Sequence, residues 1–149
     1  MKRVLFSQTA DPPILLPLDG EEVTLLSLEV PECDKHKLFK IDVSFELNFS
    51  VRLEPVTLPF LVDLHYQLFD GSGDGRMELT PILKETVCGT AKVNPQVVDF
   101  ESNTTPNLTI VAEGLVNQNL TLVANLNIVQ GKVIFPLVRV RAMSVKIFP

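Results

Sequence analysis

The sequence has little of what several protein classes need. It has no tryptophan, one tyrosine and only two cysteines among its 149 residues. Two cysteines are too few for a disulfide-rich scaffold, and a four-ligand zinc site would have to recruit both histidines as well. No run of about 18 uncharged apolar residues occurs, so no membrane-spanning helix is expected.

Positive charge is also scarce. The chain has 13 lysines and arginines against 18 acidic residues, a formal net charge of -5, and no basic stripe. Nucleic acid is therefore a poor candidate partner. No phosphate-binding, dinucleotide-binding or zinc-protease motif is present. We predict no catalytic residue and no cofactor, and expect that the protein is not an enzyme.

A period of two dominates the chain. Apolar and polar residues alternate over 41–53 and again over 60–68, which predicts strands with one buried face. The segments 107–116 and 119–129 resemble each other and are joined by Asn117 and Gln118, which predicts a hairpin. Shorter strands are expected at 4–8, 23–30, 77–87, 96–101 and 133–148. In the last of these the alternation slips, which predicts either a β-bulge near Met143 and Ser144 or a strand covered on both faces.

These strands predict an all-β fold of two antiparallel sheets. No window holds a capped amphipathic helix, and eight or nine short strands are typical of a β-sandwich. An immunoglobulin-like sandwich usually has a buried tryptophan, which this chain lacks, so a jelly roll is favoured. We divide the chain into a short N-terminal arm at residues 1–13 and a jelly-roll domain at residues 14–149.

Five segments form an ordered pattern along the chain: ILLPLD (14–19), VTLLSL (23–28), FKIDVSF (39–45), LHYQLF (64–69) and AMSVKIFP (142–149). A cysteine-containing loop at Cys33 lies between the second and the third, and the last segment ends in Ile-Phe-Pro. Taken in order, these features resemble the endospore appendage and spore-surface jelly-roll subunits of spore-forming Firmicutes.

The resemblance implies a subunit that polymerises into a pilus-like fibre on a spore surface or outside a cell. Copies of the chain would be its partners, together with a surface or anchoring protein, and sheets would augment one another. The arm would dock into a neighbour through Val4, Leu5 and Phe6. These three residues form the only apolar run near the N-terminus, which is too short for a secretory signal, so synthesis in the cytoplasm is expected.

The loop 70–75 matches the first half of a calcium-binding loop. Asp70, Ser72 and Asp74 occupy alternating positions, but Pro81 stands where a bidentate glutamate belongs. A plain turn rich in glycine and aspartate explains the same residues. If a weak surface calcium site exists, Glu78 is the candidate for the additional carboxylate.

The two cysteines, Cys33 and Cys88, leave three alternatives open. They can be reduced thiols, an intrachain disulfide or an interchain disulfide, and the interchain form is favoured outside a cell. The histidines are expected to be solvated or half-buried. Although Asp63 and His65 share one face of their strand, no nucleophile can be placed against them.

Charges near the end of the chain have two interpretations. Arg139 and Arg141 are expected on one face of the last strand, where they would protect an edge from indiscriminate pairing. Alternatively, they would meet Glu21 and Glu22 of a neighbouring copy across an assembly interface.

Two other functions compete with the fibre subunit. One is a trimeric jelly-roll tip or adhesin, similar to tumour necrosis factor, that binds a ligand. The scarcity of aromatic residues argues against a sugar as that ligand. The other is a viral or phage shell protein, which would form closed particles instead of fibres.

Overall fold

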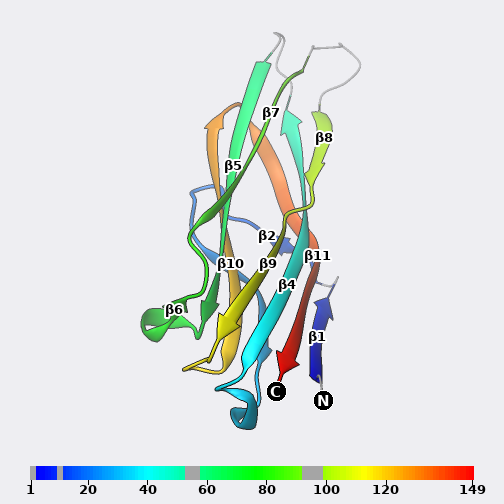
Figure 1. The fold of residues 1–149 in the computed structure, drawn as a ribbon. Helices are drawn as coiled ribbons and strands as arrows, with labels where there is room; N and C mark the ends of the chain where they lie inside the picture. The colour runs from blue at the N-terminus through cyan, green and yellow to red at the C-terminus, as the bar shows by residue number, and fades with distance from the viewer. Residues whose placement is uncertain (1–2, 10–11, 53–57, 92–98) are drawn as a thin grey trace.

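Residues 3–9, 12–52, 58–91 and 99–149 are described in the structure, a computed structural model, and form two sheets packed face to face (Figure 1). Short 3-10 turns lie in two of the connections. The six-stranded sheet contains β1 (Arg3–Thr9), β2 (Ile14–Leu15), β4 (Leu38–Arg52), β8 (Asp99–Thr104), β9 (Asn107–Glu113) and β11 (Val133–Phe148). The five-stranded sheet contains β3 (Val23–Glu29), β5 (Leu58–Asp70), β6 (Met77–Glu78), β7 (Leu83–Ala91) and β10 (Asn119–Gln130). The turns are η1 (Glu32–Asp34) and η2 (Gly73–Gly75).

The strand order identifies the architecture. In the six-stranded sheet, β1 and β2 both pair with one side of β11, β4 pairs with its other side, and β8 and β9 both pair with the far side of β4. In the five-stranded sheet, the order is β3, β10 and β5, and β6 and β7 both pair with the far side of β5. The chain stays within one sheet from β1 to β2, from β5 to β7 and from β8 to β9, and every other connection crosses between sheets. This interleaving is a jelly roll. The predicted fold class is confirmed.

The core lies between the inner faces of β4 and β5. The expected alternation holds in both strands, so that every second side chain is apolar or aromatic and points between the sheets. Phe45 packs edge-on against Tyr66 with ring centroids 5.4 Å apart, and Phe49 packs against Phe60 at 6.2 Å. Such aromatic pairs add about 0.5–1.5 kcal/mol to the stabilisation from burying their area. Residue 53, at the end of the predicted strand, lies outside the described residues.

The hairpin predicted across Asn117 and Gln118 is wrong. β9 pairs with β4, whereas β10 pairs with β3 and β5 in the other sheet. β9 ends at Glu113, before the predicted end at residue 116, and the link to β10 buries Leu115 at the end of the sandwich. The Leu115 amide donates to the Lys35 carbonyl at 2.6 Å. The link therefore spans the two layers because its leucine fills the gap between them.

The bulge predicted near Met143 and Ser144 lies elsewhere. The pairing of β11 with β4 shifts register twice, once between Ile134 and Leu137 and once between Val138 and Arg141. Val138 and Arg141 both point inward, although three positions separate them. Two residues facing one partner residue reset the alternation of a strand, which explains the slip in the sequence.

The strand predicted at 77–87 is broken into β6 and β7. Between them, the Thr80 hydroxyl accepts from the Leu68 amide at 3.1 Å, and the Thr80 carbonyl accepts from Gln67 Nε2 at 2.8 Å. Pro81 follows and has no N–H to add to a sheet. In the strand predicted at 96–101, residues 96–98 lie outside the described residues and the rest begins β8.

Replacement of a leucine at the centre of this core tests the packing. Leu64→Ala should lower the free energy of unfolding by about 2–5 kcal/mol, because Leu64 is fully buried in β5 and the substitution leaves a cavity. Urea denaturation measures the change. Val129→Ala, at an exposed position of β10, is the control and should change stability by less than about 0.5 kcal/mol. Equal losses in the two variants would contradict the assignment of the core.

Candidate assembly surfaces

The N-terminal segment forms an edge strand of its own chain. β1 pairs antiparallel with β11, with Leu5 opposite Val145, and Leu5 packs against the core. Val4 and Phe6 point outward and are 57% and 61% exposed. Within one chain the segment therefore extends the six-stranded sheet, and the division of the chain into an arm and a domain stays a prediction. Docking of this strand into a neighbour stays a prediction.

A charged cluster holds the start of β1 against η1. The Arg3 guanidinium donates to the buried Asp34 carboxylate at 2.9 Å, and Lys37 Nζ donates to the same group at 2.7 Å. The hydrogen bond from Lys37 and the positive charges of Lys37 and Arg3 hold the pKa of Asp34 below its ordinary 3.8, against the opposing effect of burial. The aspartate thus ties β1 to the body of the domain.

The opposite edge of the same sheet also exposes an apolar side chain. Val111 on β9 is 65% exposed. It shares one outward row with Val4, because Val4 pairs with Lys146, Lys146 with Lys40, and Lys40 with Val111. Strand direction alternates along β1, β11, β4 and β9, so β1 and β9 run in opposite directions at the two edges. Figure 1 shows these two strands on opposite sides of β4 and β11.

The basic residues near the end of the chain do not share a face. Arg139 is exposed, whereas Arg141 is 4% exposed because the second bulge of β11 turns it inward. The Arg141 guanidinium donates to the carbonyls of Pro12 and Val138, both at 3.2 Å. Arg141 therefore anchors the chain after β1 to β11 and is not available to a neighbour at the surface.

The two acidic residues expected at the same interface also differ. Glu21 is exposed, and its amide donates to the Asp19 carboxylate at 3.0 Å. Glu22 accepts two hydrogen bonds from Arg76, which raise the pKa of that arginine. The Arg76 guanidinium also lies 3.9 Å from the centroid of the Phe69 ring, as a cation–π contact. Glu22 is thus paired within its own chain.

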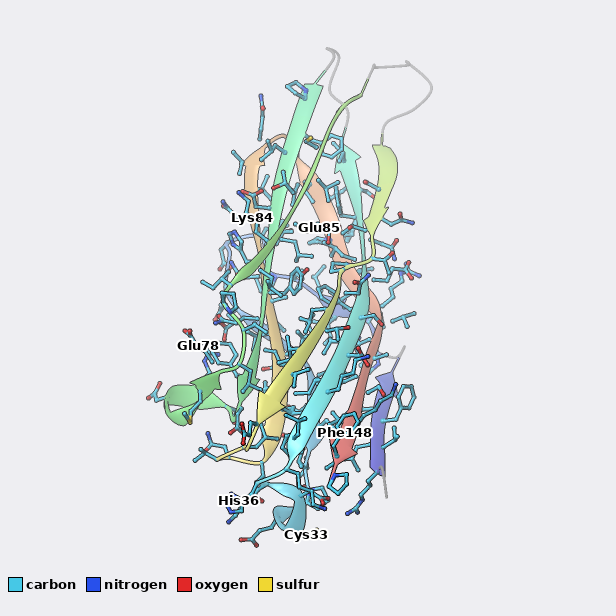
Figure 2. The ribbon with its side chains drawn as sticks, in the orientation of Figure 1. Cys33, His36, Glu78, Lys84, Glu85 and Phe148 are labelled. Carbon is cyan, nitrogen blue, oxygen red and sulfur yellow. The ribbon has the colours of Figure 1, made fainter. Side chains whose placement is uncertain are left out.

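Asp70 ties two loops together. Its carboxylate is 2% exposed and accepts from the Val116 amide at 2.5 Å and from the Asn117 amide at 3.0 Å. The Asn117 side chain returns a hydrogen bond to the Asp70 carbonyl at 2.9 Å. The other calcium candidates lie apart from this tie: Ser72 and Asp74 are exposed on the η2 turn, and Glu78 is exposed on β6 (Figure 2). Among the described residues, no three acidic, histidine or cysteine side chains are grouped to hold a metal ion.

The two cysteines are free thiols in the described structure, and both are exposed. Cys33 lies in η1, and His36 lies in the turn that follows it, at the end of the sandwich that holds the chain termini (Figure 2). Cys88 lies in the other sheet, on β7 opposite Leu61 of β5. The structure therefore contains no intrachain disulfide between them, and an interchain bond stays a prediction.

Asp63 and His65 lie on the outer face of β5, as expected. The Asp63 carboxylate accepts from the Thr86 hydroxyl at 2.7 Å and forms an ion pair with Lys84 at 3.1 Å. The hydrogen bond from Thr86, together with Lys84, lowers the pKa of Asp63. These contacts join β5 to β7, so the Asp63 carboxylate has a structural role between the two strands.

Sequence reasoning missed the outward Phe135. The residue falls within the strand expected at 133–148, but it lies at the first bulge of β11 with a φ of 50° and is 68% exposed. The available signal was Pro136, because proline within a central strand marks a bulge. A residue other than glycine in this left-handed region costs of the order of 1–3 kcal/mol.

Comparison with solved structures finds chains from infectious bursal disease virus. A chain in the structure of the Gx strain matches with a TM-score of 0.51 and 14% identity, over 98% of this chain and 32% of that one. A chain of the VP2 subviral particle matches with a TM-score of 0.28 and 16% identity, over 99% of this chain and 41% of that one. This chain thus spans less than half the length of either. The first likeness agrees with the jelly-roll fold.

No protein-family model matches the chain, and no curated protein matches it. In the part of the chain that the structure describes, no helix is long and apolar enough to span a membrane.

The tie made by Asp70 gives a test of the calcium hypothesis. Asp70→Ala should lower the free energy of unfolding by about 1–3 kcal/mol, because it leaves two backbone amides without their acceptor. Asp74→Ala, on the exposed turn, is the matched control and should change stability by less than about 0.5 kcal/mol. Calcium should leave the Tm of the wild type unchanged in a thermal melt. A calcium-dependent rise that Asp70→Ala abolishes would contradict the structural role.

The cluster at Asp34 predicts an acid-sensitive attachment of β1. Since the pKa of Asp34 is lower in the folded state, its ion pairs stabilise the fold above pH 3.8, and this stabilisation is lost as the pH falls through the lowered pKa. The difference in unfolding free energy between wild type and Asp34→Asn should therefore shrink from about pH 6 to about pH 3. Urea denaturation over this range measures it, with Asp74→Asn as the control. A difference that stays constant with pH would contradict the prediction.

Proposed function

We propose that this protein is a structural subunit that assembles with copies of itself into a fibre by adding sheet to sheet. The observation that supports this most is the pair of apolar edges of the six-stranded sheet. Val4 and Phe6 on β1 and Val111 on β9 are all exposed, and exposed apolar edge strands invite pairing with another chain. The proposal assigns no catalytic role to the chain.

The directions of the edge strands favour an open-ended assembly. A second copy shifted sideways, without being inverted, would place its β1 antiparallel beside β9 of the first. Each copy would then offer β9 to the next one, and a contact between two different surfaces repeats without closing unless a rotation closes it. Transfer of β1 itself into the neighbour's sheet, as expected for an arm, would use the same strand.

The fibre form and its place are the finer parts of the proposal. The resemblance to endospore appendage subunits supports a pilus-like fibre on a spore surface or outside a cell. The likeness to a chain of a virus structure supports the fold only. Cys33 in η1 and Cys88 on β7 are both exposed, so crosslinks between copies are possible and the assembly is to be tested with and without reductant.

Lysine at both edges should abolish the fibres. Val4→Lys combined with Val111→Lys places like charges on strands that would pair, and lysine on an edge discourages pairing. Both positions are exposed, so the fold should be retained. Negative-stain electron microscopy and sedimentation velocity of the purified chain, with and without reductant, measure the outcome. Ile82→Lys, exposed between β6 and β7, is the control and should leave fibres intact.

Deletion of residues 1–12 gives a second variant, and it too should abolish fibres. Survival of fibres in reductant would show that the cysteines are not the joints. A wild type that stays monomeric in all conditions would overturn the proposal. Discrete trimers would favour the ligand-binding tip, and closed particles would favour a shell protein over a fibre subunit.

A further inference from the structure

A hollow of about 540 Å³ opens on the outer face of the six-stranded sheet, beside the first bulge of β11. One wall consists of the outward side chains of Glu46, Asn48 and Ser50 on β4. The other wall consists of Phe135 and Arg139 on β11. Hollows of this size hold whole small ligands, so an aromatic ring from another molecule fits with room to spare.

Phe135 is held in this hollow against its local preference. Val133 points into the core, and simple alternation would bury Phe135 two positions later. Instead, the positive φ and the bulge turn the ring into water. Backbone strain and an exposed aromatic ring are both unfavourable in a lone chain, and the two together are typical of a contact surface. Leu15, exposed on β2 opposite Leu137, extends the apolar surface.

The hollow carries one acidic and one basic side chain, so the hollows of two copies can match each other in charge. Arg139 is basic and Glu46 is acidic, and the Asn48 amide donates to Glu46 Oε1 at 2.7 Å, which orients that carboxylate. A twofold rotation places the arginine of one copy over the glutamate of the other and the reverse, so both pairs form at once. A partner with a strong charge of one sign would leave one of these groups unmatched.

We infer that this face binds a second copy of the chain about a twofold axis, with Phe135 of each copy entering the hollow of the other. The inference rests on the proposed function in assigning self-assembly to the chain, and it adds an interface that the edge strands do not use. Two aromatic rings brought together in this way pack favourably. The contact is small, so the dimer should be weak, with a Kd in the micromolar range or above.

The face is best tested where the edges are blocked. In the Val4→Lys/Val111→Lys background, sedimentation equilibrium should show a monomer–dimer equilibrium. Phe135→Gly in that background should raise the Kd by at least about 30-fold, because aromatic anchors at interface centres carry most of the binding energy. The same variant should unfold at an equal or higher urea concentration, since glycine adopts a positive φ without strain. Loss of the dimer could then not be attributed to unfolding.

Charge exchange tests the twofold geometry. In the same edge-blocked background, the variants Arg139→Glu and Glu46→Arg should each be monomeric alone. An equimolar mixture of the two should form a heterodimer, because every arginine then meets a glutamate of the other copy. The double variant Arg139→Glu/Glu46→Arg should again form a homodimer. A mixture that stays monomeric, or a dimer that ignores all of these changes, would overturn the inference.

The outcomes separate this interface from the proposed function. If the wild type forms fibres but the edge-blocked chain is monomeric at every concentration, the face contact is wrong and the fibre subunit stands. If the wild type forms no fibre but the edge-blocked chain dimerises through Phe135, the face contact stands and the fibre subunit is wrong.

Discussion

The contact between the inner faces of β4 and β5 supports the rest of the structure. These two long strands follow each other in the chain but belong to different sheets, and aromatic pairs such as Phe45 with Tyr66 lock them face to face. β8, β9 and β11 pair with β4, whereas β6, β7 and β10 pair with β5. Each sheet is therefore assembled on one half of this contact. Because burial of the shared faces provides most of the folding free energy, the polar outer faces can vary without loss of the fold.

The sequence predicts what depends on alternation and misses what depends on interruptions. The period of two in β4 and β5 was sufficient to place their inner faces, because only a strand with one buried face is stable with that pattern. The connection at Asn117 and Gln118 could not be placed in the same way, since a short polar link serves equally within one sheet or between two. What decides between these is Leu115, whose burial at the end of the sandwich is a tertiary effect.

The candidate surfaces were predictable only in part. The apolar run at Val4, Leu5 and Phe6 marked the correct strand, but its pairing with β11 of the same chain depends on the whole sheet. The two bulges of β11 could not be located, so Arg139 and Arg141 were expected together although one is exposed and the other buried. Charge partners such as Arg76 for Glu22 lie far apart in sequence, and no local pattern connects them.

The same bulges link the fold to the proposed assembly. A regular β11 would bury Phe135 and leave a flat polar face, and then only the edges of the sheet would offer a surface to another copy. Edge contacts between different strands extend in one direction, whereas a twofold face contact joins two copies and stops. The two proposed contacts would use different residues, β1 with β9 for one and the hollow beside Phe135 for the other, so neither would block the other. A chain with both would form filaments in pairs, which are stiffer than single ones because bending must disturb two rows of contacts together.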